Sequence, residues 1–287
     1  GVYSGPHPGP TSGGSEGSVE RISYLVRMGR TSFPLREPVL RSAVRTLGPS
    51  PSSSALDVGC GLGEATLLLT EAVGKAGRVT GVDFSGQMLA LAEADAAQAG
   101  LSDRVSYRQA DARSLPFPDD AFDWAWSVDC VGYAPTDPRP PLREMARVVR
   151  PGGRVILMSW SSETLLPGHP LLEARLKASR AGLAPFSPHA PPERHFLRAL
   201  AWFRRLGLVR PAACSFAGSA HAPLDRPMRE ALAALFAMRW PGVEQELSAQ
   251  DRDAYRRLCL PASPDFILDH PDYCAIFTYT AFHGIVP

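Results

Sequence analysis

A short apolar run that ends in three closely spaced glycines constrains this chain more than any other feature. Residues 55–63 read Ala-Leu-Asp-Val-Gly-Cys-Gly-Leu-Gly, and a second acid, Asp83, ends another apolar run 20 residues after Gly63. A buried strand followed by a glycine turn lets the main chain approach a ligand closely. An acid at the tip of the next strand can accept both hydroxyls of a ribose. The pair therefore predicts a nucleoside site.

Short β-branched runs alternate with helical patterns between residues 55 and 160. This alternation is typical of α/β proteins in which helices cover both faces of a mostly parallel sheet. With two further strands nearer the C-terminus, we predict a Rossmann-like sheet of seven strands. The strands are expected at 55–58, 79–82, 105–108, 122–128, 155–160, 212–217 and 273–282.

The N-terminal segment differs in composition from this core. Residues 1–17 are rich in Gly, Ser and Pro, so we expect a disordered leader there. Residues 18–48 carry two helical patterns, one ending near Gly29 and one starting after Pro34. We expect these N-terminal helices to form a cover over the core or to pack on the sheet.

The rest of the chain divides into a core and a C-terminal part. We assign residues 49–160 to the cofactor-binding core and residues 161–287 to the rest of the sheet. Two less regular stretches, 161–193 and 224–265, are expected to be helical insertions after strands five and six. We expect them to form the substrate side of the protein.

Charge and cysteine content limit which partners and which cellular compartment we expect. The net charge is only +1, which argues against a nucleic acid as substrate. The five cysteines are widely spaced, contain no CxxC pair and follow no secretory segment, and no apolar stretch is long enough to cross a bilayer. We therefore expect a cytoplasmic protein that acts on a small molecule and holds no metal ion. A homo-oligomer is left open.

Two cofactors fit a glycine loop with a distal acid: a dinucleotide and S-adenosylmethionine. The spacing here is Gly-x-Gly-x-Gly, whereas dinucleotide sites use Gly-x-Gly-x-x-Gly. Asp57 also stands two residues before the first glycine, where it would repel a pyrophosphate and attract an ammonium group. Both features favour S-adenosylmethionine.

Four segments together resemble the class I S-adenosylmethionine-dependent methyltransferases. The similarity extends from about residue 38 to residue 160 and is nearest to the small-molecule group that includes the ubiquinone/menaquinone and sterol methyltransferases. The segments are Leu56–Gly63, Gly81–Leu89, Gln109–Asp123 and Leu142–Gly153.

The resemblance implies a set of cofactor contacts. The glycine loop would lie against the methionine and sugar, the acid after strand two would bind the ribose, and the residues beyond it would flank the adenine. The acid after strand three would receive the adenine amino group, and the end of strand four would lie near the sulfonium. In that order the residues are Asp57, Gly59, Cys60 and Gly61; Asp83; Phe84 and Met88; Asp111 and Ala112; and Ser127. Phe84 and Met88 could instead be core residues, and Asp111 could cap a turn.

The implied reaction is in-line transfer of a methyl group to carbon or oxygen of an apolar or aromatic metabolite. A sulfonium donor is already activated, so alignment and exclusion of water are the main requirements, and a dedicated base need not exist. Asp129 and Tyr133 follow strand four and are the candidates for accepting a proton and orienting the acceptor. Each has an alternative reading, as a loop acid and a packing aromatic.

The wall of the acceptor pocket is expected to come from aromatic residues outside the core motifs. These are Tyr24, Phe33, Trp160, Phe186, Phe196, Phe236 and Trp240. Two other functions stay open. One is a protein of this fold that binds the cofactor without transferring a methyl group, and the other, more remote, is an NAD-dependent oxidoreductase.

Overall fold

The computed structural model describes residues 15–133, 136–186 and 189–287. Its centre is a seven-stranded sheet in the order β3-β2-β1-β4-β5-β7-β6, which confirms the predicted fold. The first five strands are parallel to one another, whereas β7 runs antiparallel to both β5 and β6. The strands are β1 Ser54–Val58, β2 Arg78–Asp83, β3 Val105–Gln109, β4 Phe122–Val128, β5 Val149–Thr164, β6 Val209–His221 and β7 Cys274–Ile285.

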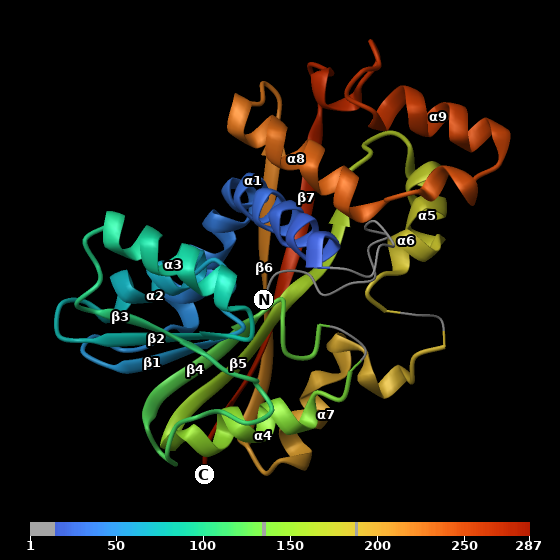
Figure 1. Ribbon diagram of the computed structural model, residues 1–287. Helices are drawn as coiled ribbons and strands as arrows, with labels where there is room; N and C mark the ends of the chain where they lie inside the picture. The colour runs from blue at the N-terminus through green and yellow to red at the C-terminus, as the bar shows by residue number, and fades with distance from the viewer. Residues whose placement is uncertain (1–14, 134–135, 187–188) are drawn as a thin grey trace.

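Helices cover both faces of the sheet (Figure 1). One buried cluster joins α1, α2, α8 and α9 to the sheet, and a second joins α4 and α7 to its other face. The helices are α1 Ser15–Leu47, α2 Glu64–Val73, α3 Gly86–Gln98, α4 Arg139–Val148, α5 Pro170–Ala178, α6 Arg180–Leu183, α7 Ala199–Arg205, α8 Arg226–Arg239 and α9 Ala249–Cys259. Helices α5 and α6 follow β5, and α8 and α9 follow β6, so the predicted insertions are present.

The prediction of two N-terminal helices was wrong. Residues Ser15–Leu47 form one helix, α1, that contains both Pro34 and Pro38. Each proline removes one backbone donor, but tertiary packing can outweigh that local cost. Here Leu35, Val39 and Leu40 are at most 2% exposed, so burial of this turn accounts for the continuous helix. Of the predicted leader, residues 1–14 lie outside the described residues, and 15–17 begin α1.

The order of the strands reverses between β1 and β4. In an open α/β sheet, the crevice beyond the carboxyl ends of two such strands is the usual ligand site. Val58 ends β1 and Val128 ends β4, so the residues that follow them face this crevice. Within the described residues, no helix combines the length and apolarity that a membrane crossing needs.

Candidate functional site

The glycine loop after β1 takes a conformation that favours glycine at three positions. Gly59, Gly61 and Gly63 have φ values of 77°, 53° and 76°, in the left-handed region that other residues rarely adopt. A Cβ atom on Gly63 would also lie 2.4 Å from the Tyr107 hydroxyl. The loop is fixed to the neighbouring strand, because the Gly59 and Cys60 amides both donate to the Val82 carbonyl, at 2.8 and 2.9 Å. Because these glycines have no side chains, the fixed loop leaves room for a ligand to approach its main chain closely.

Asp83 ends β2 and points towards the glycine loop. Its Oδ2 atom accepts the Gly61 amide at 2.9 Å, and its Oδ1 atom accepts the Ser85 amide at the same distance. A carboxylate offers about four lone-pair sites, so two acceptor positions stay available after these bonds. The carboxylate is therefore held in place by main chain and can still accept both hydroxyls of a vicinal diol.

The other residues predicted around the adenosine differ in exposure. Phe84 is 79% exposed, which is unusual for a large apolar residue. Met88, on α3, is only 4% exposed. Asp111 is exposed at the tip of β3 and forms a two-point ion pair with Arg113, whose guanidinium lowers the pKa of that carboxyl. Ala112 is half-buried beside it. Phe84 is thus free to cover a flat ligand, and Met88 is core.

Asp57 is a fully buried carboxyl group beneath the glycine loop. It is 1% exposed, and its Oδ2 atom accepts a hydrogen bond from the Thr66 hydroxyl at 2.7 Å. Burial raises the pKa of Asp57 to about 6, although the Thr66 bond opposes the shift. A buried acid with a strongly shifted pKa beside a ligand cleft is typical of functional sites.

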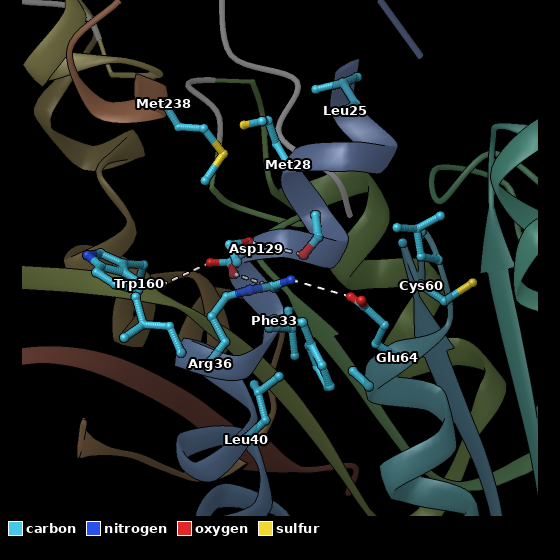
Figure 2. Close-up of a pocket in the computed structure, with 18 of the residues that line it drawn as sticks. Leu25, Met28, Phe33, Arg36, Leu40, Cys60, Glu64, Asp129, Trp160 and Met238 are labelled. Atoms are coloured by element: carbon cyan, nitrogen blue, oxygen red, sulfur yellow. Dashed lines mark hydrogen bonds and ion pairs between the residues drawn. The ribbon is translucent and has the colours of Figure 1, made fainter. Parts of the chain in front are cut away.

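A pocket at the sheet crevice connects the glycine loop with α1 and α8 (Figure 2). The empty space between its walls is about 970 Å³, a figure that includes open solvent at the mouth. Asp57 comes from β1, Gly59, Cys60 and Gly61 come from the loop after it, and Asp129 follows β4. The opposite wall is largely apolar, with Leu25, Met28, Phe33 and Leu40 from α1, and Leu235 and Met238 from α8.

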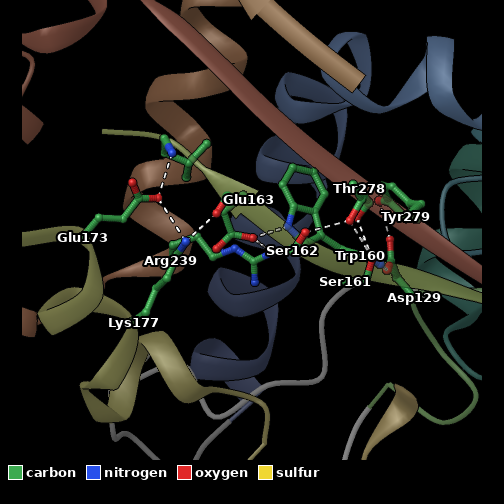
Figure 3. Close-up of polar contacts among 11 residues, drawn as sticks. Asp129, Trp160, Ser161, Ser162, Glu163, Glu173, Lys177, Arg239, Thr278 and Tyr279 are labelled. Carbon is green, nitrogen blue, oxygen red and sulfur yellow. Dashed lines mark hydrogen bonds and ion pairs between the residues drawn. The ribbon is translucent and has the colours of Figure 1, made fainter. Parts of the chain in front are cut away.

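Asp129 is held firmly at the floor of this pocket. The Tyr279 hydroxyl donates to its Oδ2 atom at 2.7 Å, and the Trp160 amide donates to its Oδ1 atom at 3.0 Å. Figure 3 shows this carboxylate at one end of a polar network that runs along β5. Asp129 also has a φ of 49°, a conformation that aspartate tolerates better than most residues. The side chain is 8% exposed, and it lines the pocket.

Seven of the predicted residues do not line this pocket: Asp83, Phe84, Met88, Asp111, Ala112, Ser127 and Tyr133. The Ser127 hydroxyl is fully buried, donates to the Val58 carbonyl at 2.8 Å and accepts the Val131 amide at 3.1 Å. It therefore ties the tip of β1 to the turn after β4. Tyr133 lines a second pocket, which Trp160 separates from the first.

The predicted aromatic wall is divided among three locations. Tyr24, Phe33 and Trp160 line the first pocket, Phe186 and Phe196 line the second, and Phe236 and Trp240 are core residues at 2% and 1% exposure.

Sequence reasoning missed four polar residues of the first pocket: Ser32 and Arg36 on α1, Glu64 at the start of α2, and Tyr279 on β7. Glu64 had a usable signal, because it directly follows Gly63 of the loop. Burial raises the pKa of Glu64, and the charge of Arg36 opposes that shift. Arg36 and Tyr279 carry no local motif and meet the site only through long-range packing.

Replacing Tyr279 with phenylalanine should destabilise the protein by about 1–3 kcal/mol, because a buried carboxylate loses a hydrogen bond. Tyr273→Phe is the matched control, since the Tyr273 hydroxyl donates to a neutral carbonyl, that of Leu165, at 3.0 Å. Urea unfolding of both variants measures the difference. An equal loss in the two would show that the Asp129 charge adds nothing to the Tyr279 bond.

Comparison with known proteins agrees with this geometry. Residues 55–153 match a family model described as a methyltransferase domain. A demethylmenaquinone methyltransferase of Bacillus cytotoxicus is 37% identical over 149 residues, which are 51% of this chain and 62% of the relative. A probable chloroplastic tocopherol O-methyltransferase of Oryza sativa subsp. japonica is 34% identical over 139 residues, or 48% of this chain and 38% of the relative. The chain thus spans about three fifths of the length of the first of these curated relatives, and less of the second.

Solved structures show the same fold at low sequence identity. The YcgJ protein of Bacillus subtilis covers 87% of this chain and 98% of its own, with a TM-score of 0.53 and 21% identity. A geranyl diphosphate methyltransferase, solved in complex with GPP and sinefungin, covers 88% of this chain and 80% of its own, with a TM-score of 0.54 and 19% identity. The glycine loop, the acid at the tip of β2 and the family match agree that residues 55–153 are similar to a methyltransferase domain.

Proposed function

We propose that this chain transfers a methyl group from S-adenosylmethionine to carbon or oxygen of a small apolar or aromatic metabolite. The observation that carries the proposal is the pocket itself, in which the glycine loop and Asp57 face a wall of apolar side chains from α1 and α8. Polar and charged groups on one side suit the cofactor, and the apolar side suits an acceptor.

The residues present fit this cofactor. Asp83 keeps two acceptor positions for the ribose hydroxyls after its two main-chain bonds. The exposed Phe84 ring beside it can cover one face of the adenine, and Asp111 with Ala112 stands at the tip of β3 for its amino group. Asp57, Gly59, Cys60 and Gly61 line the pocket where the methionine end would lie. Ser127 would act indirectly, by fixing the turn next to the sulfonium.

When bound, the cofactor supplies an electrophilic methyl group on a positively charged sulfur. The protein then has to align the acceptor and keep water out. The apolar residues of α1 and α8 exclude water, and Asp129 offers a fixed hydrogen-bond acceptor to a hydroxyl of the acceptor. A proton released from such a hydroxyl can move to the Asp129 carboxylate. Tyr133 would orient only an acceptor that extends past Trp160 into the second pocket.

The C-terminal part of the chain supports the acceptor side of this proposal. Leu235 and Met238 of the pocket wall come from α8, which lies inside the predicted insertion 224–265. Relatives named for methylating demethylmenaquinone and tocopherol favour a ring-bearing acceptor. They also favour methyl transfer over the two other functions left open by the sequence. Each of the five cysteines is a free thiol, which is consistent with a reducing, cytoplasmic location.

Incubation with methyl-labelled S-adenosylmethionine tests the proposal. The probes are a reduced 1,4-naphthoquinone and 1-naphthol, each with Asp83→Ala as the control with weakened cofactor binding. With the cofactor held near the concentration that half-saturates the wild type, we expect label in at least one product and much less label with the variant. Binding of S-adenosylhomocysteine without transfer to these probes or to any component of a cell extract would instead favour a protein of this fold that does not methylate.

A further inference from the structure

Of the described residues that line the first pocket, Arg36 is the one cation, and three acids line the pocket with it. It lies between Asp129 and Glu64 (Figure 2), with one Nη atom 3.5 Å from Glu64 Oε2 and the other 4.0 Å from Asp129 Oδ2. Burial works against the charged form, yet Tyr279, Glu64 and Asp129 outweigh it and raise the pKa of the Arg36 guanidinium. The group is therefore a cation at neutral pH.

The contacts of Arg36 are longer than those of a well-made ion pair. Charge-assisted hydrogen bonds are about 2.7–2.9 Å long, and Arg41, one turn further along the same helix, meets Glu37 at 2.8 Å and Glu71 at 2.7 Å. The Arg36 Nε atom is buried and has no hydrogen-bond partner within the described residues. The guanidinium thus keeps donor capacity that Glu64 and Asp129 do not use.

A cation and an acid side by side match both charges of an α-amino-acid group. Glu64 and Asp57 line the same pocket as Arg36 and offer carboxylates to an ammonium. Arg36 offers a planar donor pair to a carboxylate, the geometry in which arginine binds best. An acceptor with a single acidic group would meet one cation and three acids, so its binding would be opposed by charge.

We propose that Arg36, with Glu64 beside it, binds the amino-acid end of the cofactor, with the guanidinium on the carboxylate. The inference rests on the proposed function and extends it to α1, which lies outside the matched residues 55–153. It makes α1 part of the cofactor site as well as a wall for the acceptor. Cofactor binding then draws α1 towards the glycine loop through this contact.

Calorimetric titration with two cofactor analogues tests the assignment. S-adenosylhomocysteine carries the amino-acid group, whereas 5′-methylthioadenosine keeps the adenosine and sulfur but lacks it. Arg36→Met should weaken S-adenosylhomocysteine binding by about 10- to 100-fold and leave methylthioadenosine binding unchanged. Arg41→Met, on the same helix, is the matched control and should change neither.

Each other result contradicts the proposal. Unchanged S-adenosylhomocysteine affinity, or equal losses for both analogues, would show that Arg36 has no role specific to the carboxylate. A loss confined to an added aromatic acid, 2-naphthoate, would assign Arg36 to the acceptor instead. Failure of the wild-type protein to bind either analogue would refute the proposed function itself, which separates the two failures.

Hydrogen exchange on the wild-type chain gives a test that does not depend on a variant's folding. S-adenosylhomocysteine should slow amide exchange in residues 24–40 of α1, and methylthioadenosine should not. Equal protection by both analogues, or by neither, would contradict a carboxylate contact from Arg36.

Discussion

Replacing Asp57 with asparagine should make the unliganded protein more stable at pH 7.5, by about 1–3 kcal/mol. Burial raises the pKa of Asp57 from 3.8 to about 6, and each pKa unit corresponds to about 1.4 kcal/mol. The folded state therefore holds the proton more tightly than the unfolded state. Stability from this group is fully present below pH 4, falls as the pH rises towards 6, and is absent above it. Asparagine removes that loss and can still accept the Thr66 hydrogen bond.

The pH dependence distinguishes this cause from general effects of the substitution. The stability gain of Asp57→Asn should shrink as the pH falls from 7.5 to 4.5, because the wild-type carboxyl becomes protonated in the folded state below about pH 6 and no longer carries a buried charge. Urea unfolding at several pH values measures it, with Asp103→Asn as a control at an exposed carboxylate. A gain that is the same at every pH would contradict the assigned burial cost.

The same substitution should weaken cofactor binding, because the ammonium group of the methionine end loses an anionic partner. Asp57 would then be a residue that lowers stability and is retained for binding, as is common in functional sites. If Asp57→Asn gains stability and binds S-adenosylhomocysteine as tightly as the wild type, Asp57 does not bind the cofactor.

Replacing Asp83 with alanine should lower S-adenosylhomocysteine affinity by about 10- to 100-fold, equivalent to about 1–3 kcal/mol for lost charge-assisted hydrogen bonds. The variant loses the ribose acceptors and also the groups that fix the Gly61 and Ser85 amides. Asp83→Asn keeps one acceptor oxygen, so its affinity for S-adenosylhomocysteine should lie between those of the wild type and Asp83→Ala. Calorimetric titration measures the affinities well below the unfolding temperature.

Asp95→Ala is the control for Asp83, because Asp95 lies on α3 and pairs with Arg30 away from the pocket. It should bind S-adenosylhomocysteine as the wild type does. Unchanged affinity in Asp83→Ala would mean that the ribose is bound elsewhere, even if the chain is a methyltransferase.

The elements that carry the cofactor residues were predictable because their signals are local. The four strands from β1 to β4 match the expected ranges within about two residues, and Ser85 caps α3 by accepting the Met88 amide at 3.3 Å. Glycine turns, β-branched runs and helix caps depend on neighbours in sequence, so they can be read without a fold. The roles of the individual cofactor residues stay predictions.

The acceptor side could not be predicted because it depends on contacts between distant segments. Tyr279 bonds to Asp129 across 150 positions of the chain, and this contact exists only because β7 inserts between β5 and β6. No local pattern marks that insertion. Pro34 led the sequence reading to break α1, and the break would have moved Arg36 away from the pocket. Packing of α1 on the sheet and on α8 explains both the continuous helix and the position of Arg36 at the pocket.

A calorimetric titration of the wild-type protein tests the central claim most directly, namely that a sulfur-bearing nucleoside binds across the tips of the strands from β1 to β4. S-adenosylhomocysteine should bind with one-to-one stoichiometry, and NADH should not compete with it. Tight binding of NADH together with no detectable binding of S-adenosylhomocysteine would contradict the account.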